Sequence, residues 1–207
     1  MKIVRESLLE FHQTGDLITS LNLGYAGYIR QFFDELGVSR DDYEIEGKSI
    51  IFSGDLNLID CAKLIELPSG LNIGGSLLLN GCTSLIKLPS GLNVNKDLKL
   101  AGCTSLTELS ESLTLDGDLD LYGCVELTKL PSGLNVKGNM NLYNCIKLAE
   151  LPGGLKVKGI LNLEECISLT ELPNDLIIGR RIYINEYQIE LINYIKHSKY
   201  KNKLEIG

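Results

Sequence analysis

The chain has 207 residues, of which 44 % are hydrophobic, and its formal net charge is −7. This composition excludes general disorder. The sequence contains no run of about 18 apolar residues, so it predicts no membrane span. The acidic balance argues against nucleic-acid binding, because phosphate contacts require clustered lysine and arginine. The first residues carry charges where a signal peptide needs an apolar core, so we expect a cytoplasmic protein, or one delivered to a host cell by a signal that its sequence does not reveal.

Residues 1–49 do not repeat, and we expect them to form an α+β cap. Helical spacing of apolar residues predicts helices over Ile3–Gln13 and Gly24–Leu36, the second ending at Gly37 in a left-handed conformation. Tyr43–Phe52 alternates around a turn and predicts a hairpin, whose second arm aligns with the end of a repeat. A repeat array needs such a cover for its exposed apolar end. An enzymatic site within residues 1–49 is an alternative role.

Residues 56–181 form six repeats of 21 residues that align without a gap. All six cysteines share one position of the repeat: Cys61, Cys82, Cys103, Cys124, Cys145 and Cys166. All five prolines share another, at which Ser110 replaces proline in one repeat. Such a period predicts a solenoid, in which each unit buries its apolar side against its neighbours. With a partial repeat at each end, the solenoid is expected over residues 50–187.

Each repeat contains two short segments with alternating apolar residues, a Leu-x-Leu such as Leu119–Leu121 and a Leu-x-Val such as Leu134–Val136. Alternation places the outer residues inward, so stacked coils should build two parallel sheets joined by an extended crossing. We therefore predict a mainly β, right-handed solenoid of seven coils with α-containing caps. One position of the repeat, two residues before the Leu-x-Leu, holds a glycine that suits a turn or bulge at positive φ: Gly54, Gly75, Gly117, Gly138 and Gly159. Lys96 and Arg180 replace this glycine in two repeats, so positive φ is not compulsory there.

Beyond the repeats, residues 188–207 are expected to form a helical C-terminal cap. Helical spacing extends over Glu186–Ser198, and residues 203–206 are expected to add a last strand. Four lysines and His197 give this end a basic cluster, which we interpret as a solvated helix end.

The motif LxLxxCxxLxxLP resembles the leucine-rich repeat family, and the resemblance covers about residues 50–187. The form LPxxLxVxGxLxLxxC is similar to repeats of bacterial and phage-borne proteins and, more loosely, to short-repeat bacterial effectors. The resemblance implies core strand positions at Leu77 and Leu79 and partner binding on the face of the Leu-x-Leu strands. The chain departs from the family signature at Gly74 and Asn95, where leucine is expected, and this favours a flatter coil than a horseshoe.

No catalytic constellation is predicted, because both histidines lie outside the repeats and the cysteines occupy a core position. We expect no metal, no cofactor and six free thiols. The leading hypothesis is a non-enzymatic protein–protein interaction module, such as a bacterial effector or a phage-associated protein. A structural or self-assembling solenoid protein is the second hypothesis, and the identity of a partner is left open, as is the oligomeric state.

The outward positions of the Leu-x-Leu sheet vary most in charge and shape, whereas those of the other sheet are smaller and more uniform. Tyr122 and Tyr143 occupy the same position in adjacent repeats and should stack. A steadying aromatic ladder is the alternative to a binding role for this pair. The predicted partner-binding residues are Lys99, Asp120, Tyr122, Asn141, Tyr143, Asn162 and Glu164.

Overall fold

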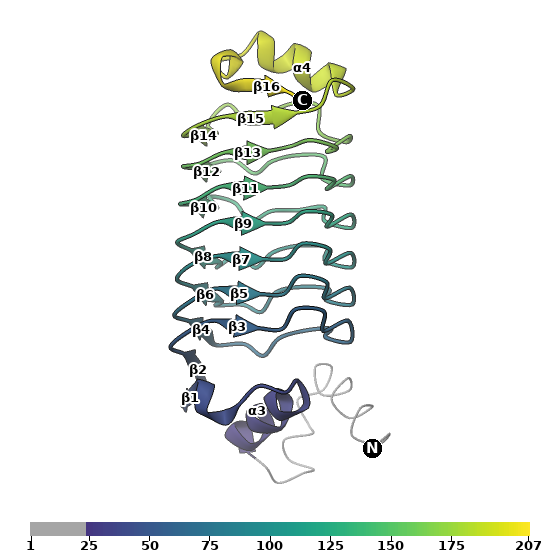
Figure 1. Cartoon of the computed structure of the whole chain (residues 1–207). Helices are drawn as coiled ribbons and strands as arrows, with labels where there is room; N and C mark the ends of the chain where they lie inside the picture. The colour runs from purple at the N-terminus through teal and green to yellow at the C-terminus, as the bar shows by residue number, and fades with distance from the viewer. Residues whose placement is uncertain (1–23) are drawn as a thin grey trace.

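The computed structural model describes residues 24–207 and shows a parallel β-solenoid of about seven turns with one helix at each end. Successive coils stack in a nearly straight column, with the N-terminal helix at one end and the C-terminal helix at the other (Figure 1). The chain passes rightward through the front strands, leftward through the back strands, and rises, so the coil is right-handed. The expected helix over Ile3–Gln13 lies outside the described residues.

The Leu-x-Leu segments form an eight-stranded front sheet, in which the strands of successive repeats pair in parallel and in register. Its strands are β3 (Leu56–Asn57), β5 (Leu77–Leu78), β7 (Leu98–Lys99), β9 (Leu119–Asp120), β11 (Met140–Asn141), β13 (Leu161–Asn162), β15 (Ile182–Ile184) and β16 (Leu204–Ile206). The last of these confirms the strand expected near the C-terminus, and it continues the sheet beyond the repeats.

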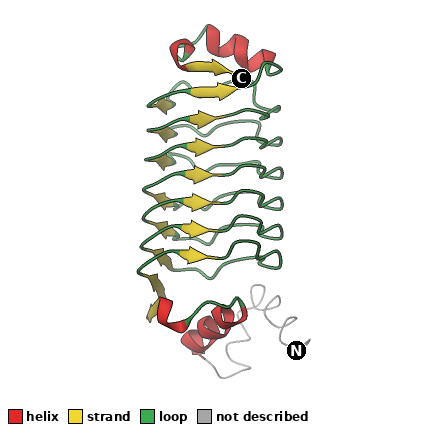
Figure 2. Ribbon diagram, viewed as in Figure 1, coloured by secondary structure: helices red, strands yellow, loops and turns green. Residues whose placement is uncertain are grey.

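The Leu-x-Val segments form the back of the solenoid, which is divided into two sheets. One contains β1 (Tyr43–Glu46), β2 (Ser49–Phe52), β4 (Leu71–Ile73), β6 (Asn93–Val94) and β8 (Thr114–Leu115), and the other β10 (Asn135–Val136), β12 (Lys156–Val157) and β14 (Ile177–Ile178). Strands β1 and β2 are the predicted hairpin, and β2 pairs in parallel with β4. The hairpin thus leads directly into the first coil. Loops make up the rest of each turn (Figure 2).

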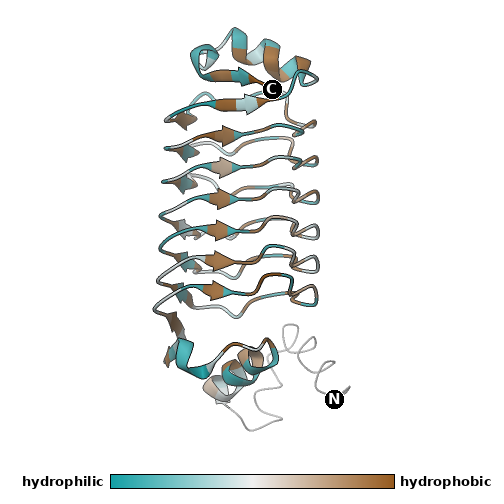
Figure 3. Cartoon of the chain, in the orientation of Figure 1, coloured by the Kyte–Doolittle hydropathy of each residue, from teal (hydrophilic) through white to brown (hydrophobic). Residues whose placement is uncertain are grey.

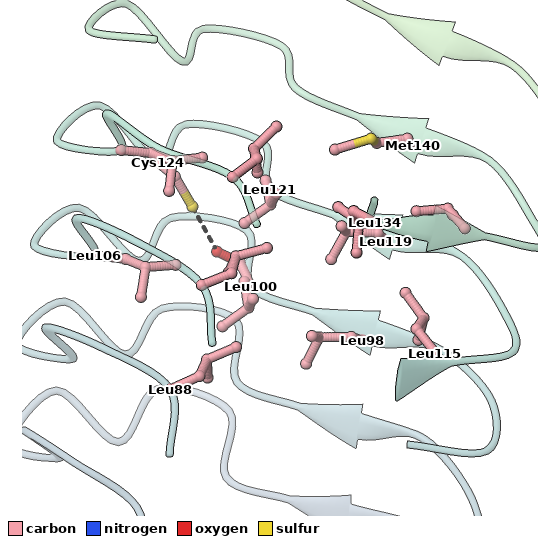
Figure 4. Packing of buried hydrophobic residues seen from close by; sticks show 14 of the residues in the cluster. Leu88, Leu98, Leu100, Leu106, Leu115, Leu119, Leu121, Cys124, Leu134 and Met140 are labelled. Carbon is pink, nitrogen blue, oxygen red and sulfur yellow. Dashed lines mark hydrogen bonds between the residues drawn. The ribbon is translucent and has the colours of Figure 1, made fainter. Parts of the chain in front are cut away.

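Apolar residues recur along the front and back strands of every coil (Figure 3), and the buried ones form one continuous core between front and back. In the third coil, Leu98, Leu100, Cys103 and Leu106 are fully buried, and the same positions of the repeat are buried again in the next coil. Figure 4 shows how leucines from successive coils meet in this core, with Met140 at one leucine position. Because a coil buries its apolar side only against its neighbours, the stack requires a cover at each end.

Both ends have such a cover. Helix α3 (Gly24–Glu35) buries Ile29 and Phe33, and the Phe33 ring packs against Tyr43 and Phe52 of the hairpin, with ring centroids 4.9 and 5.3 Å away. A 3-10 turn, η1 (Arg40–Asp42), joins α3 to β1. The left-handed residue expected after the helix is confirmed at Gly37, with φ of 75°.

The C-terminal cap is α4 (Ile189–Lys196), which is shorter than the expected Glu186–Ser198 and buries Leu191, Ile192 and Ile195. It is followed by the 3-10 turn η2 (Lys201–Lys203). The hydroxyl of Tyr194 donates to the carbonyl of Leu172 at 2.8 Å, and that of Tyr200 donates to the carbonyl of Pro173 at 2.6 Å. These two tyrosines fix the cap to the last coil.

The prediction of positive φ at the glycine before each Leu-x-Leu was wrong. Positive φ occurs instead at glycines such as Gly81 and Gly133, and at Asp60, Asn144 and Glu165. At Gly138 the reason for glycine is proximity, because an added Cβ would meet the Asp118 side chain and lie 2.8 Å from the Asp118 backbone nitrogen. That Asp118 carboxylate accepts a hydrogen bond from the N–H of Asn139 at 2.7 Å. The glycine therefore makes room for a hydrogen bond between consecutive coils.

Candidate binding face

The predicted partner-binding residues lie together on the front sheet, on β7, β9, β11, β13 and the turns that follow these strands. Lys99, Asp120, Asn141 and Asn162 are the outward residues of four consecutive paired strands. Tyr122, Tyr143 and Glu164 follow two residues after the last three of them. We call this set of seven residues the front face.

The two tyrosines of the front face stack, as predicted. Their ring centroids are 5.0 Å apart and their planes differ by 8°. Tyr122 is 49 % exposed, whereas Tyr143 is half-buried between its neighbours. Neither ring belongs to the core cluster, so the pair forms a flat aromatic surface against the side of the solenoid.

The outward Asp and Asn side chains serve a second purpose that the sequence did not predict. Asp120 accepts the backbone N–H of Tyr122 at 3.2 Å, Asn141 accepts that of Tyr143 at 3.1 Å, and Asn162 accepts that of Glu164 at 2.9 Å. Asp120 also accepts the side-chain amide of Asn141 at 3.0 Å. These side chains therefore hold the turn after each strand and orient the tyrosines. The sequence contains the pattern that could have predicted these bonds, because Asp and Asn side chains often accept the backbone N–H two residues further on.

Charge on the front face is partly compensated. The Lys99 ammonium lies 3.6 Å from one carboxylate oxygen of Asp97 and 3.8 Å from one of Asp118. Ion pairs of this exposure contribute little to stability. Glu164 at the other end lies close to Gly207, so the C-terminal residue borders the front face.

The cysteines form a buried column behind the front sheet. Five thiols donate to a carbonyl of the preceding coil, as Cys124 does to Leu100 at 3.2 Å (Figure 4). Burial raises the pKa of Cys82 to about 11 and that of Cys103 to about 12. Cys61, in the first coil, is only partly buried. All six are free, as predicted, and their environment keeps them protonated and weakly nucleophilic.

Within residues 24–207, no group of three or more His, Cys, Asp or Glu side chains is placed to hold a metal ion. None of the helices described in that range is long and apolar enough to cross a membrane.

Repeats of equal length stacked in parallel define this protein as a β-solenoid repeat protein. Comparison with protein-family models, with curated proteins and with solved structures finds no match to the chain.

Proposed function

We propose that the chain is a non-enzymatic protein–protein interaction module built on leucine-rich-repeat-like coils, and that a partner protein binds to the front face. The observation that carries the proposal is the stacked pair Tyr122 and Tyr143, beside which charged and amide side chains lie. Tyrosines are enriched at binding hot spots, because they offer a large contact area with few rotatable bonds.

The rigidity of the front face supports the proposal. Hydrogen bonds from the backbone N–H groups of Tyr122 and Tyr143 to the preceding side chains fix both turns before a partner arrives. Binding to such a surface loses less conformational freedom than binding to mobile side chains. The tyrosine hydroxyls are then available to hydrogen-bond a partner.

The back of the solenoid provides the contrast. Its outward residues, among them Asn93, Thr114 and Asn135, are exposed and mostly small. Thr114 donates its hydroxyl hydrogen to the side chain of Asn93, so part of this polarity is satisfied within the chain. The same position continues with Lys156 and with Ile177, which is 55 % exposed, so the back is mostly but not wholly polar, and we interpret it as the solvated side.

The test compares two double variants in partner capture and in affinity measured by calorimetry. Tyr122→Ala with Tyr143→Ala should weaken binding by about 2 kcal/mol or more. The matched control, Asn93→Asp with Asn135→Asp on the back, should bind as the parent does. If the tyrosine variant binds normally and the control loses binding, the partner binds to the back of the solenoid and the proposal is wrong. Light scattering at several concentrations separates a foreign partner from self-assembly.

A further inference from the structure

A second surface, independent of the front face, lies at the N-terminal end of the back sheet. Among the strands of residues 24–207, β1 is the outermost there and pairs with β2 alone. An outer strand presents backbone donors and acceptors that an additional strand can use.

The register of the hairpin identifies which backbone groups of β1 point outward. Ile45 lies opposite Ile50, and the N–H of Ile50 donates away from β1, to the carbonyl of Gly70 at 2.9 Å. Residues opposite each other in an antiparallel pair direct their backbone groups either toward each other or both away. The N–H and C=O of Ile45 therefore point away from β2. Neither has a backbone hydrogen-bond partner elsewhere in residues 24–207.

The space beside this outer side of β1 is open. A hollow of about 650 Å³ is lined by Arg30 of α3, Arg40 of η1 and all four residues of β1, and by no residue of β2. Its volume is within the range of about 300–1,000 Å³ that ligand sites occupy. The hydroxyl of Tyr43 is buried and has no hydrogen-bond partner among the described residues. The hollow is therefore bordered by the outward backbone groups of β1.

Charge at this hollow selects the partner. Glu44 and Glu46 line the hollow, and Asp41 and Asp42 precede β1 in the chain. All four are exposed, and none forms an ion pair within residues 24–207. Arg40 is already engaged by Asp34, whose carboxylate accepts its Nε–H at 3.1 Å. Arg30 is the one remaining cation of the lining. Lys48 in the turn after β1 adds one exposed cation, so the surroundings of β1 carry more carboxylates than cations.

We infer that the outer side of β1 binds an extended segment of another protein in which lysine or arginine recurs at every second residue. The segment would add a strand beside β1, with its basic side chains on the face of Glu44 and Glu46 and its apolar side chains on the face of Tyr43 and Ile45. A second copy of β1 fits poorly, because antiparallel self-pairing would bring carboxylates of both copies together.

The experiment uses the full chain and a short labelled peptide in which lysine alternates with valine, with binding followed by fluorescence anisotropy. Ile45→Pro removes the outward N–H of β1 while leaving its bonds to β2 intact, because proline is tolerated on an outer strand. We expect it to weaken peptide binding about tenfold or more, which corresponds to about 1.4 kcal/mol. Ile206→Pro in β16, the outer strand at the opposite end of the molecule, should leave binding unchanged.

Two further measurements keep the inference testable if Ile45→Pro is unstable. Glu44→Gln with Glu46→Gln should weaken binding, and a peptide with N-methyl groups on alternate residues should lose it when the methyls fall on the pairing side. Equal binding of the methylated and unmethylated peptides would show simple charge attraction and overturn the inference. Concentration-dependent dimerisation that Ile45→Pro abolishes would identify a second copy as the occupant and would also overturn it.

Discussion

The side-chain amide of Gln188 donates a hydrogen bond to the carbonyl of Leu163 at 2.9 Å and takes the place that a cysteine thiol has in the coils below. Gln188 is the one buried polar residue in the part of the chain that the structure describes. Its amide also reaches the carbonyl of Cys166 at 3.3 Å, and its oxygen accepts the N–H of Asn185 at 2.9 Å. The column of thiols thus ends in a residue that joins the C-terminal cap to the last repeat.

Replacement of Gln188 by leucine should destabilise the protein by about 2 kcal/mol, because two buried carbonyls and one N–H lose their partner. Urea denaturation followed by circular dichroism measures this loss. Limited proteolysis should show earlier cleavage near α4 than in the parent. The control is replacement of the exposed Glu190 by glutamine on the same cap. An equal loss of stability in the control would show that the hydrogen bonds of Gln188 do not stabilise the cap.

Gly138→Ala should cost about 2 kcal/mol, because the added methyl group would collide with the preceding coil and displace the Asp118 carboxylate from the N–H of Asn139. Gly54 occupies the same position in the repeat, but no atom of the described residues lies within 4 Å of an added Cβ. Gly54→Ala should therefore be close to neutral. The test is thermal unfolding of both variants. Equal destabilisation would refute the conclusion that close contact with the preceding coil requires glycine at position 138.

Alkylation of the folded protein with iodoacetamide should modify Cys61 first and the other five thiols more than about tenfold more slowly, because these must wait for local opening. Cys61 is partly exposed and the remaining five are buried. Peptide mass analysis after short reaction times identifies the order. Faster reaction at Cys103 than at Cys61 would contradict the buried column.

Stability should decrease in alkaline solution because of the cysteine column. Burial raises the pKa of Cys82 from 9.0 to about 11 and that of Cys103 to about 12 in the folded state. A raised pKa means that the folded protein holds the proton more tightly than the unfolded chain does. The contribution of these thiols to the free energy of unfolding is therefore complete below pH 9 and is lost as the pH rises toward 12. Urea midpoints of the parent and of Cys103→Ala across this range provide the test. The variant should show a shallower decline.

Tyr122→Ala and Tyr143→Ala should each leave the fold intact and, combined, show a coupling of about 1 kcal/mol, which is typical of a stacked aromatic pair. The stability of the parent, the two single variants and the double variant forms the required cycle. Zero coupling would show that the stacking of the two rings, whose centroids are 5.0 Å apart, contributes nothing to the free energy of unfolding.

The sequence predicted the front and back sheets because the strict period of the repeats specifies which side chains recur at each level. Leu-x-Leu alternation correctly placed residues such as Leu119 inward and Asp120 outward. The hairpin before the first coil was predicted from a turn at Gly47, whose φ of 61° suits a two-residue connection. The front-face residues were brought together as expected, because equal repeat positions stack in a solenoid.

Other features depended on contacts between coils, which the period does not reveal. The sequence suggested that glycines such as Gly138 were needed for their backbone angles, whereas tertiary structure shows that the Asp118 side chain of the coil below occupies the space of a Cβ. Gln188 could not be recognised as the successor of the cysteines, because it lies one residue out of step with their column. Repetition within the chain thus determined the architecture, and packing between neighbouring coils decided which atoms meet.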